Sequence, residues 1–241
     1  MMAQTFLLIH GAWHGAWCWW KVQAGLEAKG HRVKVIDLPG LGIDSTPPNQ
    51  VTLDDYAARI EQALDGLQRV VLVGHSMGGI AISAGAERQP KPIAKLVYLS
   101  AFLLPSGRSL LDVAQADTES LATPNLIPNP ERGFVDVNRA EVKNIFYGQC
   151  STAEVALAQS LLKVSPLAPF ATPLVLTDQR YGKIDRFYIK GLRDRAITPK
   201  AQQQMLEDMP CKKVFELDTD HSPFMSRAEE TVVLLDQIAR G

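Results

Sequence analysis

One stretch decides the expected fold: Arg69-Val70-Val71-Leu72-Val73-Gly74-His75-Ser76-Met77-Gly78-Gly79. A β-branched apolar run ends abruptly in the pattern Gly-x-Ser-x-Gly, and a small-residue, helix-like segment follows over 78–88. This pattern is typical of a nucleophile elbow, a sharp strand-to-helix turn where glycines let the two elements pass closely. The same five letters also arise by chance in loops of small residues, but the flanking strand and helix favour the elbow. We therefore predict that Ser76 is a nucleophile.

A nucleophilic serine needs a base, and five histidines are available: His10, His14, His31, His75 and His221. His221 is the candidate, because it follows the strand-like run 212–217 and should stand at the carboxyl edge of a sheet. We expect the side chain of His75, inside the elbow, to point away from the face that presents Ser76. His10 and His14 have the i, i+4 spacing of a metal pair, but neighbouring glycines indicate a loop and no H-E-x-x-H pattern is present. We expect no metal.

The third group should be a carboxylate between Ser76 and His221 in the chain, because such sites keep the order serine, acid, histidine. Asp194 follows the strand candidate 186–189 and is the predicted acid, although a surface aspartate in a charged patch would give the same pattern. Asp218 and Asp220 lie closer to His221, but neighbours on one short loop rarely reach the far side of an imidazole. A buried Asp194 would orient the ring and stabilise the imidazolium.

An oxyanion formed at Ser76 needs two hydrogen-bond donors. One should be the backbone N–H of Met77, directly after the nucleophile, and the other should come from the loop after an early strand. The strand-like run 5–9 is followed by Gly11 and Ala12, so we predict the Ala12 N–H as the second donor.

Strand and helix patterns alternate along the chain, which predicts an α/β fold with a mostly parallel, doubly wound sheet. The expected strands are 5–9, 32–36, 70–73, 95–99, 186–189 and 212–217, and the expected helices are 19–29, 52–67, 78–88, 199–209 and 228–240. The segment from about 105 to 182 interrupts this alternation, with a Pro- and Asn-rich part and then a helical part. We predict one domain over residues 1–241, with 105–182 inserted as a cap over Ser76.

Apolar cap residues should form the substrate pocket, which favours small to medium uncharged esters over phosphorylated or peptide substrates. The candidates are Leu121, Leu126, Phe134, Phe146, Tyr147, Leu161, Leu162 and Leu167, most of which belong to the core of the cap.

The chain resembles the α/β-hydrolase superfamily, and within it the branch of plant methylesterases, plant hydroxynitrile lyases and related bacterial carboxylesterases. The matching segments are 9–17 (IHGAWHGAW), 74–79 (GHSMGG), 146–151 (FYGQCS), 177–182 (TDQRYG), Asp194 and Asp220-His221. The resemblance implies a helical cap after the sixth strand, a triad of Ser76, Asp194 and His221, an acyl-enzyme intermediate, and no cofactor.

The same resemblance separates ester hydrolysis from carbon–carbon cleavage. The lyases of this branch carry threonine where this chain has Gly11, and lysine where it has Ser222. Both are missing here, so a carboxylesterase is the first hypothesis, with carbamates and amides as further substrates of the same chemistry. A hydroxynitrile lyase-type enzyme and a receptor-like binding protein on the same fold are the alternatives.

Composition limits the partners and the location. The formal net charge of -1 offers no basic field for nucleic acid. No apolar run approaches the roughly 18 residues that span a bilayer, and no signal-like segment precedes the first strand. Three cysteines without metal-ligand spacing fit a reducing, cytoplasmic setting. A small-molecule ester is the expected partner, and the sequence leaves open whether the protein forms a homodimer.

Overall fold

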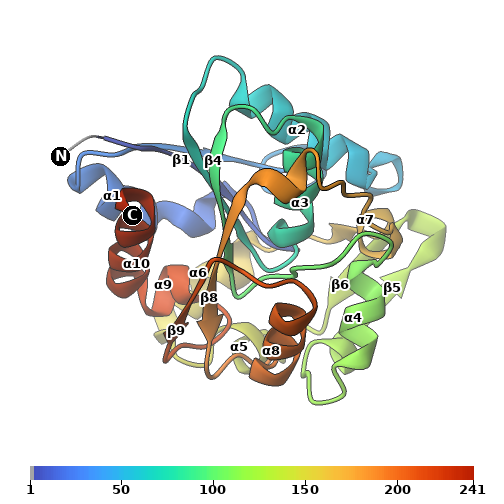
Figure 1. The fold of residues 1–241 in the computed structure, drawn as a ribbon. Coiled ribbons are helices and arrows are strands. Elements are labelled where there is room, and N and C mark those ends of the chain that lie inside the picture. The colour runs from blue at the N-terminus through green and yellow to red at the C-terminus, as the bar shows by residue number, and fades with distance from the viewer. Residues whose placement is uncertain (1–2) are drawn as a thin grey trace.

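Six parallel strands form the central sheet of the computed structural model, which describes residues 3–241 (Figure 1). They are β1 (Thr5–Ile9), β2 (Arg32–Ile36), β3 (Val70–His75), β4 (Ile93–Leu99), β8 (Asp185–Gly191) and β9 (Lys213–Leu217). The order is β2-β1-β3-β4-β8-β9, and every neighbouring pair is parallel. All six residues of β3 are buried, as expected for a continuous apolar strand that is covered on both faces.

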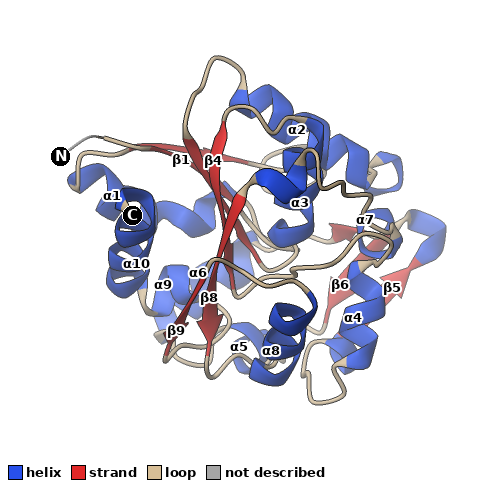
Figure 2. Ribbon diagram, in the orientation of Figure 1, coloured by secondary structure: helices blue, strands red, loops and turns tan. Residues whose placement is uncertain are grey.

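Helices cover both faces of the sheet, which confirms the doubly wound prediction. In Figure 2 the sheet lies between one group containing α1, α9 and α10 and another containing α2 and α3. The helices are α1 (Trp20–Ala28), α2 (Leu53–Leu64), α3 (Gly78–Arg88), α8 (Pro199–Asp208), α9 (Pro223–Ser226) and α10 (Ala228–Arg240). Helix α2 is shorter than expected at both ends. Thr52 is its N-cap in a capping box with Asp55, and the chain leaves the helix before Gly66, whose φ is +69°.

The cap contains a small sheet that the sequence did not predict. The cap combines helices α4 (Leu110–Ala116), α5 (Val142–Phe146), α6 (Thr152–Leu161) and α7 (Ala168–Ala171) with three antiparallel strands, β5 (Leu126–Asn129), β6 (Phe134–Val137) and β7 (Ser165–Pro166). The expected helical cap is therefore helical only in part. The reason is the turn between β5 and β6, which closes at Gly133 with a left-handed φ of +66°.

The cap also follows the fourth strand of the sheet, β4, and not the sixth as the resemblance implied. Within the described residues, the chain before the cap supplies β1 to β4 only, and β8 and β9 follow it. Short 3₁₀ helices complete the chain: η1 (Ala16–Trp19), η2 (Pro48–Gln50), η3 (Thr123–Asn125), η4 (Pro130–Arg132) and η5 (Tyr181–Lys183). No helix described for residues 3–241 has both the length and the apolar character needed to cross a membrane.

The strand order defines where the site lies. The chain runs from β1 to β2 on one side and then returns to β3 on the other side of β1. Ligand sites of open parallel sheets form at the carboxyl ends of the strands on either side of such a reversal. The loop at 10–13 follows β1, and Ser76 follows β3, so both stand at this position. Asp194 and His221 follow the neighbouring strands β8 and β9.

Candidate active site

Ser76 stands at a strained turn between β3 and α3. Its φ is +54°, a left-handed value that is uncommon for a residue with a side chain. Strand β3 and helix α3 pass so closely at this turn that a Cβ on Gly74 would lie 2.5 Å from the carbonyl oxygen of Gly78. Backbone hydrogen bonds hold the turn: the Ser76 carbonyl accepts from Gly79 N at 3.0 Å and from Phe102 N at 3.1 Å. The sequence pattern therefore corresponds to a real elbow geometry.

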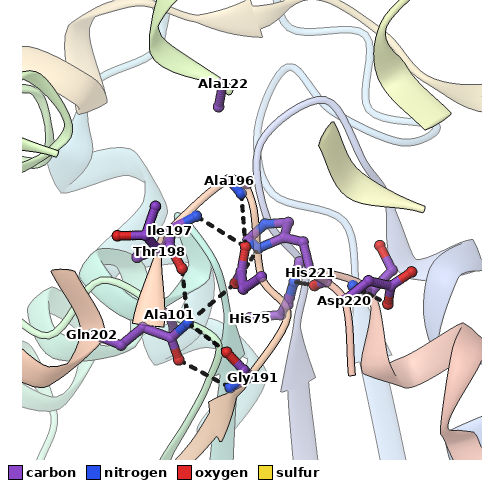
Figure 3. A network of polar contacts seen from close by, with 12 residues as sticks. His75, Ala101, Ala122, Gly191, Ala196, Ile197, Thr198, Gln202, Asp220 and His221 are labelled. Carbon is purple, nitrogen blue, oxygen red and sulfur yellow. Dashed lines mark hydrogen bonds and ion pairs between the residues drawn. The ribbon is translucent and has the colours of Figure 1, made fainter. Parts of the chain in front are cut away.

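Asp194 and His221 form a buried pair. The Nδ1 atom of His221 lies 2.8 Å from Oδ2 of Asp194, and both side chains are almost entirely excluded from solvent. The other carboxylate oxygen of Asp194 accepts hydrogen bonds from Ala196 N at 2.8 Å and Ile197 N at 3.0 Å (Figure 3). The Gln202 side-chain amide donates to Oδ2 at 3.4 Å. The carboxylate is thus fixed in its orientation toward the imidazole.

The two competing aspartates have other partners. Asp218 is exposed and forms a bidentate ion pair with Arg193. Asp220 is buried, and it accepts from Gln149 N at 2.7 Å and from the Ser226 hydroxyl at 2.6 Å. Among the hydrogen bonds of residues 3–241, neither carboxylate contacts the ring of His221.

Two backbone amides beside Ser76 are free to donate. Met77 directly precedes α3, so its N–H belongs to the positive end of that helix. Within the part of the chain that the structure describes, the N–H groups of Ala12 and Met77 make no hydrogen bond. Both residues line the same pocket as Ser76 and His221.

Two buried histidines hold the loop that carries Ala12. Leu38 N donates to Nε2 of His10 at 3.1 Å, so Nδ1 of His10 donates to the carbonyl of Gly11 at 2.8 Å. His14 contacts the Ala12 carbonyl through Nδ1 at 2.6 Å and the Tyr147 hydroxyl through Nε2 at 2.5 Å. Burial lowers the pKa of His10, and it lowers the pKa of His14 to about 3, so both rings stay neutral. The i, i+4 pair therefore fixes a loop conformation.

The cap holds the next residue of this loop. Trp13 has a left-handed φ of +63°. Its N–H donates to the Ser165 hydroxyl at 2.7 Å, its indole donates to the Val135 carbonyl at 3.0 Å, and its carbonyl accepts from Lys163 N at 2.9 Å. No pattern in the sequence pointed to these contacts, because their partners lie more than a hundred residues away.

A small apolar pocket opens beside Ser76, with a cavity volume of about 40 Å³. Its walls are Ala12, Trp13, Met77, Phe102, Leu110, Ala122, Thr123, Leu126, Phe146, Phe170, Ala196, Ile197 and His221. Of the eight predicted cap residues, Leu126 and Phe146 line it and Leu121, Phe134, Tyr147, Leu161, Leu162 and Leu167 do not. Apolar character alone could not separate the pocket from the cap core or from exposed positions such as Leu161 on α6.

Comparison with known proteins decides the family. The model of the alpha/beta hydrolase family matches residues 6–234. This chain belongs to the alpha/beta hydrolase family. The match includes all six strands of the sheet except the first residue of β1, and it covers the cap and both loops that carry Asp194 and His221.

This alpha/beta hydrolase is similar to plant methylesterases of Arabidopsis thaliana. Putative methylesterase 11, chloroplastic, is 36% identical over 98% of this chain, which spans 64% of that relative's length. Methylesterase 7 is 33% identical, over 98% of this chain and 96% of the relative.

Solved structures with esterase or hydrolase names share the fold. Polyneuridine aldehyde esterase matches with a TM-score of 0.88 and 26% identity, over 99% of this chain and 100% of that one. A pyrethroid hydrolase from Sphingobium faniae JZ-2 matches with a TM-score of 0.87 and 25% identity, over 100% and 98% of the two chains.

Proposed function

We propose that this protein is a carboxylesterase that cleaves small to medium hydrophobic esters, with Ser76 as nucleophile, His221 as general base and Asp194 as the orienting acid. One observation carries the proposal: the buried 2.8 Å Asp194–His221 pair opens onto the same apolar pocket as the strained Ser76. The names of the relatives and structural neighbours, methylesterase, esterase and hydrolase, support ester hydrolysis.

The proposed mechanism follows from the hydrogen bonds of His221. Because Nδ1 donates to the carboxylate of Asp194, Nε2 of the neutral ring is unprotonated. Nε2 takes the proton of Ser76 while Oγ attacks the ester carbonyl, and the Ala12 and Met77 N–H groups bind the resulting oxyanion. His221 then gives the proton to the departing alcohol, and water releases the acyl group by the same steps. The chemistry uses side chains and backbone amides alone.

The proposed substrate class follows from the pocket. Apart from His221, its walls carry no ionisable side chain that could pair with a carboxylate or phosphate. Its cavity volume of about 40 Å³ lies well below the range of about 300–1,000 Å³ for small-molecule sites, so only compact groups fit the pocket in this conformation. An uncharged ester with a compact apolar acyl or alcohol group fits both features.

The local geometry also favours a hydrolase over the lyases that the chain resembles. A Cβ on Gly11 would lie 2.8 Å from Cβ of Ser76, so this backbone leaves no room for a threonine side chain. Ser222, which stands where those lyases carry lysine, is fully buried and supplies no charge for cyanide.

A panel of p-nitrophenyl and methyl esters tests the proposal. We expect turnover that a serine-directed phosphonate abolishes, with the phosphonate found on Ser76 by mass spectrometry. Mandelonitrile and acetone cyanohydrin should release no cyanide above the buffer rate in the same preparation. Cyanide release that needs Ser76, without ester turnover, would favour the lyase. Binding without any turnover would favour a receptor-like protein.

The proposal includes a reducing, cytoplasmic location. All three cysteines fall within the described residues and are free thiols. Burial raises the pKa of the Cys18 and Cys150 thiols, so both behave as unreactive apolar groups. Fluorescence microscopy of the tagged chain in its own cells tests this location.

A further inference from the structure

The histidine next to the nucleophile contacts the proposed base. His75 is fully buried, and its Nε2 lies 2.8 Å from the main-chain carbonyl oxygen of His221 (Figure 3). A carbonyl oxygen only accepts hydrogen bonds, so Nε2 of His75 carries the proton. Burial, together with the charge that His221 can carry, holds the pKa of His75 well below its ordinary value, so the ring stays neutral.

This contact joins two loops that are 146 residues apart in sequence. The main chain of His75 leads directly into Ser76 at the end of β3, and its side chain reaches the loop after β9. The two imidazole rings also pack together, with centroids 4.7 Å apart at an interplanar angle of 54°. His75 therefore links the nucleophile turn to the backbone of His221.

The hydrogen bond from His75 is the contact that ties the backbone of His221 to the nucleophile turn. Asp194 holds the ring through Nδ1, and the ring of Phe146 packs on it at 5.5 Å. Neither contact fixes the peptide that carries the imidazole. The peptide between His221 and Ser222 is held at both ends. Its N–H donates to Oδ1 of Asp220 at 3.1 Å, and its carbonyl accepts from Nε2 of His75, which acts from the same turn that sets the position of the Ser76 hydroxyl.

The polar character of His75 serves this contact and no other. Within the described residues, Nδ1 of His75 has no hydrogen-bond partner. A buried imidazole is costly to desolvate unless its polar atoms are paired, so an apolar ring would suit a residue that only fills space. Phe224 packs against the ring of His75 with centroids 4.8 Å apart, as it would against an apolar ring. The Nε2–H group is the feature that an apolar residue would lack.

We propose that His75 is a positioning residue for the reaction assigned above, and that its Nε2–H hydrogen bond sets the backbone of His221 relative to Ser76. The inference rests on the proposed function, because it gives the contact a role in catalysis. It predicts a loss of kcat when the donor is removed, since misplacing reacting groups by about 1 Å can cost about 10²-fold in rate.

Two amide variants form a matched pair. The amide nitrogen of His75→Gln can occupy the position of Nε2, whereas the amide of His75→Asn corresponds to Nδ1 and is too short to reach the His221 carbonyl. We expect His75→Gln to keep kcat within a few-fold of the wild type, and His75→Asn to lower kcat by about 10²-fold with an unchanged KM. Equal values of kcat in the two variants, or a rise in KM alone, would overturn the proposal. Thermal unfolding of each variant shows whether it is folded.

A measurement on the wild-type protein needs neither turnover nor a variant. In ¹⁵N-labelled protein, NMR of the imidazole nitrogens should show His75 as the neutral Nε2–H form throughout the range of about pH 5 to 8 in which ordinary histidines titrate. A ring that titrates there, or that carries its proton on Nδ1, would refute the proposed contact even if His75→Asn fails to fold. A wild type without Ser76-dependent ester turnover would instead refute the proposed function, and the NMR spectrum would still decide the contact.

Discussion

The edge of the sheet and the cap make different contributions to the pocket. Ser76, His221, Ala12 and Met77 all stand on loops that follow strands of the parallel sheet. The cap supplies apolar walls to the same pocket: Leu110, Ala122, Leu126, Phe146 and Phe170, together with Thr123, whose hydroxyl donates to the carbonyl of Ala114. The reactive groups thus come from the sheet edge alone, whereas both regions supply apolar walls, since Trp13, Phe102, Ala196 and Ile197 also stand on loops that follow strands of the sheet.

From this difference we expect that substitutions in one region change the rate of ester hydrolysis, and that substitutions in the other change the selectivity among esters. Strand ends in a packed sheet hold side chains precisely, as chemistry requires, whereas loops and short elements above them can change the shape of the pocket. Substitutions at the sheet edge should lower kcat for every ester. Substitutions in the cap should change the preference among esters.

The largest effect is expected for Ser76→Ala. Removing the hydroxyl eliminates the acyl-enzyme route, and we expect kcat to fall by about 10⁶-fold, by analogy with the loss of a triad serine in a protease. Thermal unfolding should change little, because alanine is smaller than serine and needs no hydrogen bond. Undiminished hydrolysis by this variant would show that Ser76 is not the nucleophile. The sheet edge would then not supply the reactive groups as we infer.

Asp194→Asn should cause the next largest loss of kcat. An amide in this position favours the wrong tautomer of His221, and the precedent of a serine protease gives a loss in kcat of about 10⁴-fold near neutral pH. The assay uses one ester at saturating concentration with purified, folded protein.

Asp218→Asn and Asp220→Asn are the matched controls for that variant. Asp218 is exposed and pairs with Arg193, so its variant should keep nearly full activity. Asp220→Asn places an amide among the donors from Gln149 and Ser226, so it should lower the melting temperature. Its effect on kcat should be much smaller than that of Asp194→Asn. If kcat collapses in either control while Asp194→Asn keeps a normal rate, our assignment of the acid to Asp194 is wrong.

Local patterns explain why the sheet edge could be predicted from the sequence. The run 70–73 is apolar, β-branched and buried on both faces, and the predicted helices at 78–88 and 228–240 have the bounds that the structure shows. The contact between Asp194 and His221 followed from chain order and from the strands that precede each residue. These features depend on a few neighbouring residues.

The cap could not be predicted in the same way, because it depends on distant contacts. Pro128 and Pro130 argue against a strand, yet β5 pairs with β6 around the left-handed turn at Gly133. Pocket residues such as Phe170 point inward only because the cap folds over the sheet. The hydrogen bonds from His75 to His221 and from Trp13 to Ser165 join segments about 150 residues apart, and no local pattern records them.

Ser165→Ala tests whether the cap also supports the chemistry. The Ser165 hydroxyl accepts from the N–H of Trp13, directly after the Ala12 amide that we assign to the oxyanion hole. Its loss leaves a buried N–H unpaired, which should destabilise the fold by about 1–3 kcal/mol. Loosening this loop should also lower kcat, by about 10-fold if Ala12 N–H moves by a fraction of an ångström.

Ser160→Ala is the control for that prediction. Ser160 is an exposed cap serine whose hydroxyl donates to the carbonyl of Leu157 within the same helix. Its variant should match the wild type in both melting temperature and kcat. If Ser165→Ala does the same, the cap affects shape alone, and the division between the two regions is stricter than we infer.

The smallest expected effect, and the one most specific to the cap, comes from Phe170→Leu. Phe170 lines the pocket and packs edge-on against Trp13, with ring centroids 6.0 Å apart. A smaller apolar side chain enlarges the cavity without adding charge. The ratio of kcat/KM for longer to shorter acyl esters should rise by about 3- to 10-fold, within the discrimination that a methylene-sized change in a pocket allows.

Phe134→Leu separates this effect from a general loosening of the cap. Phe134 is a half-buried cap phenylalanine that lies outside the pocket lining, with the Arg132 guanidinium over its ring. Since both variants remove one aromatic ring from the cap, both can loosen it, but only Phe170→Leu enlarges the space in front of Ser76. We expect Phe134→Leu to leave the ester preference unchanged. Equal shifts in the two variants would show that cap mobility, and not the wall at Phe170, sets the preference among esters.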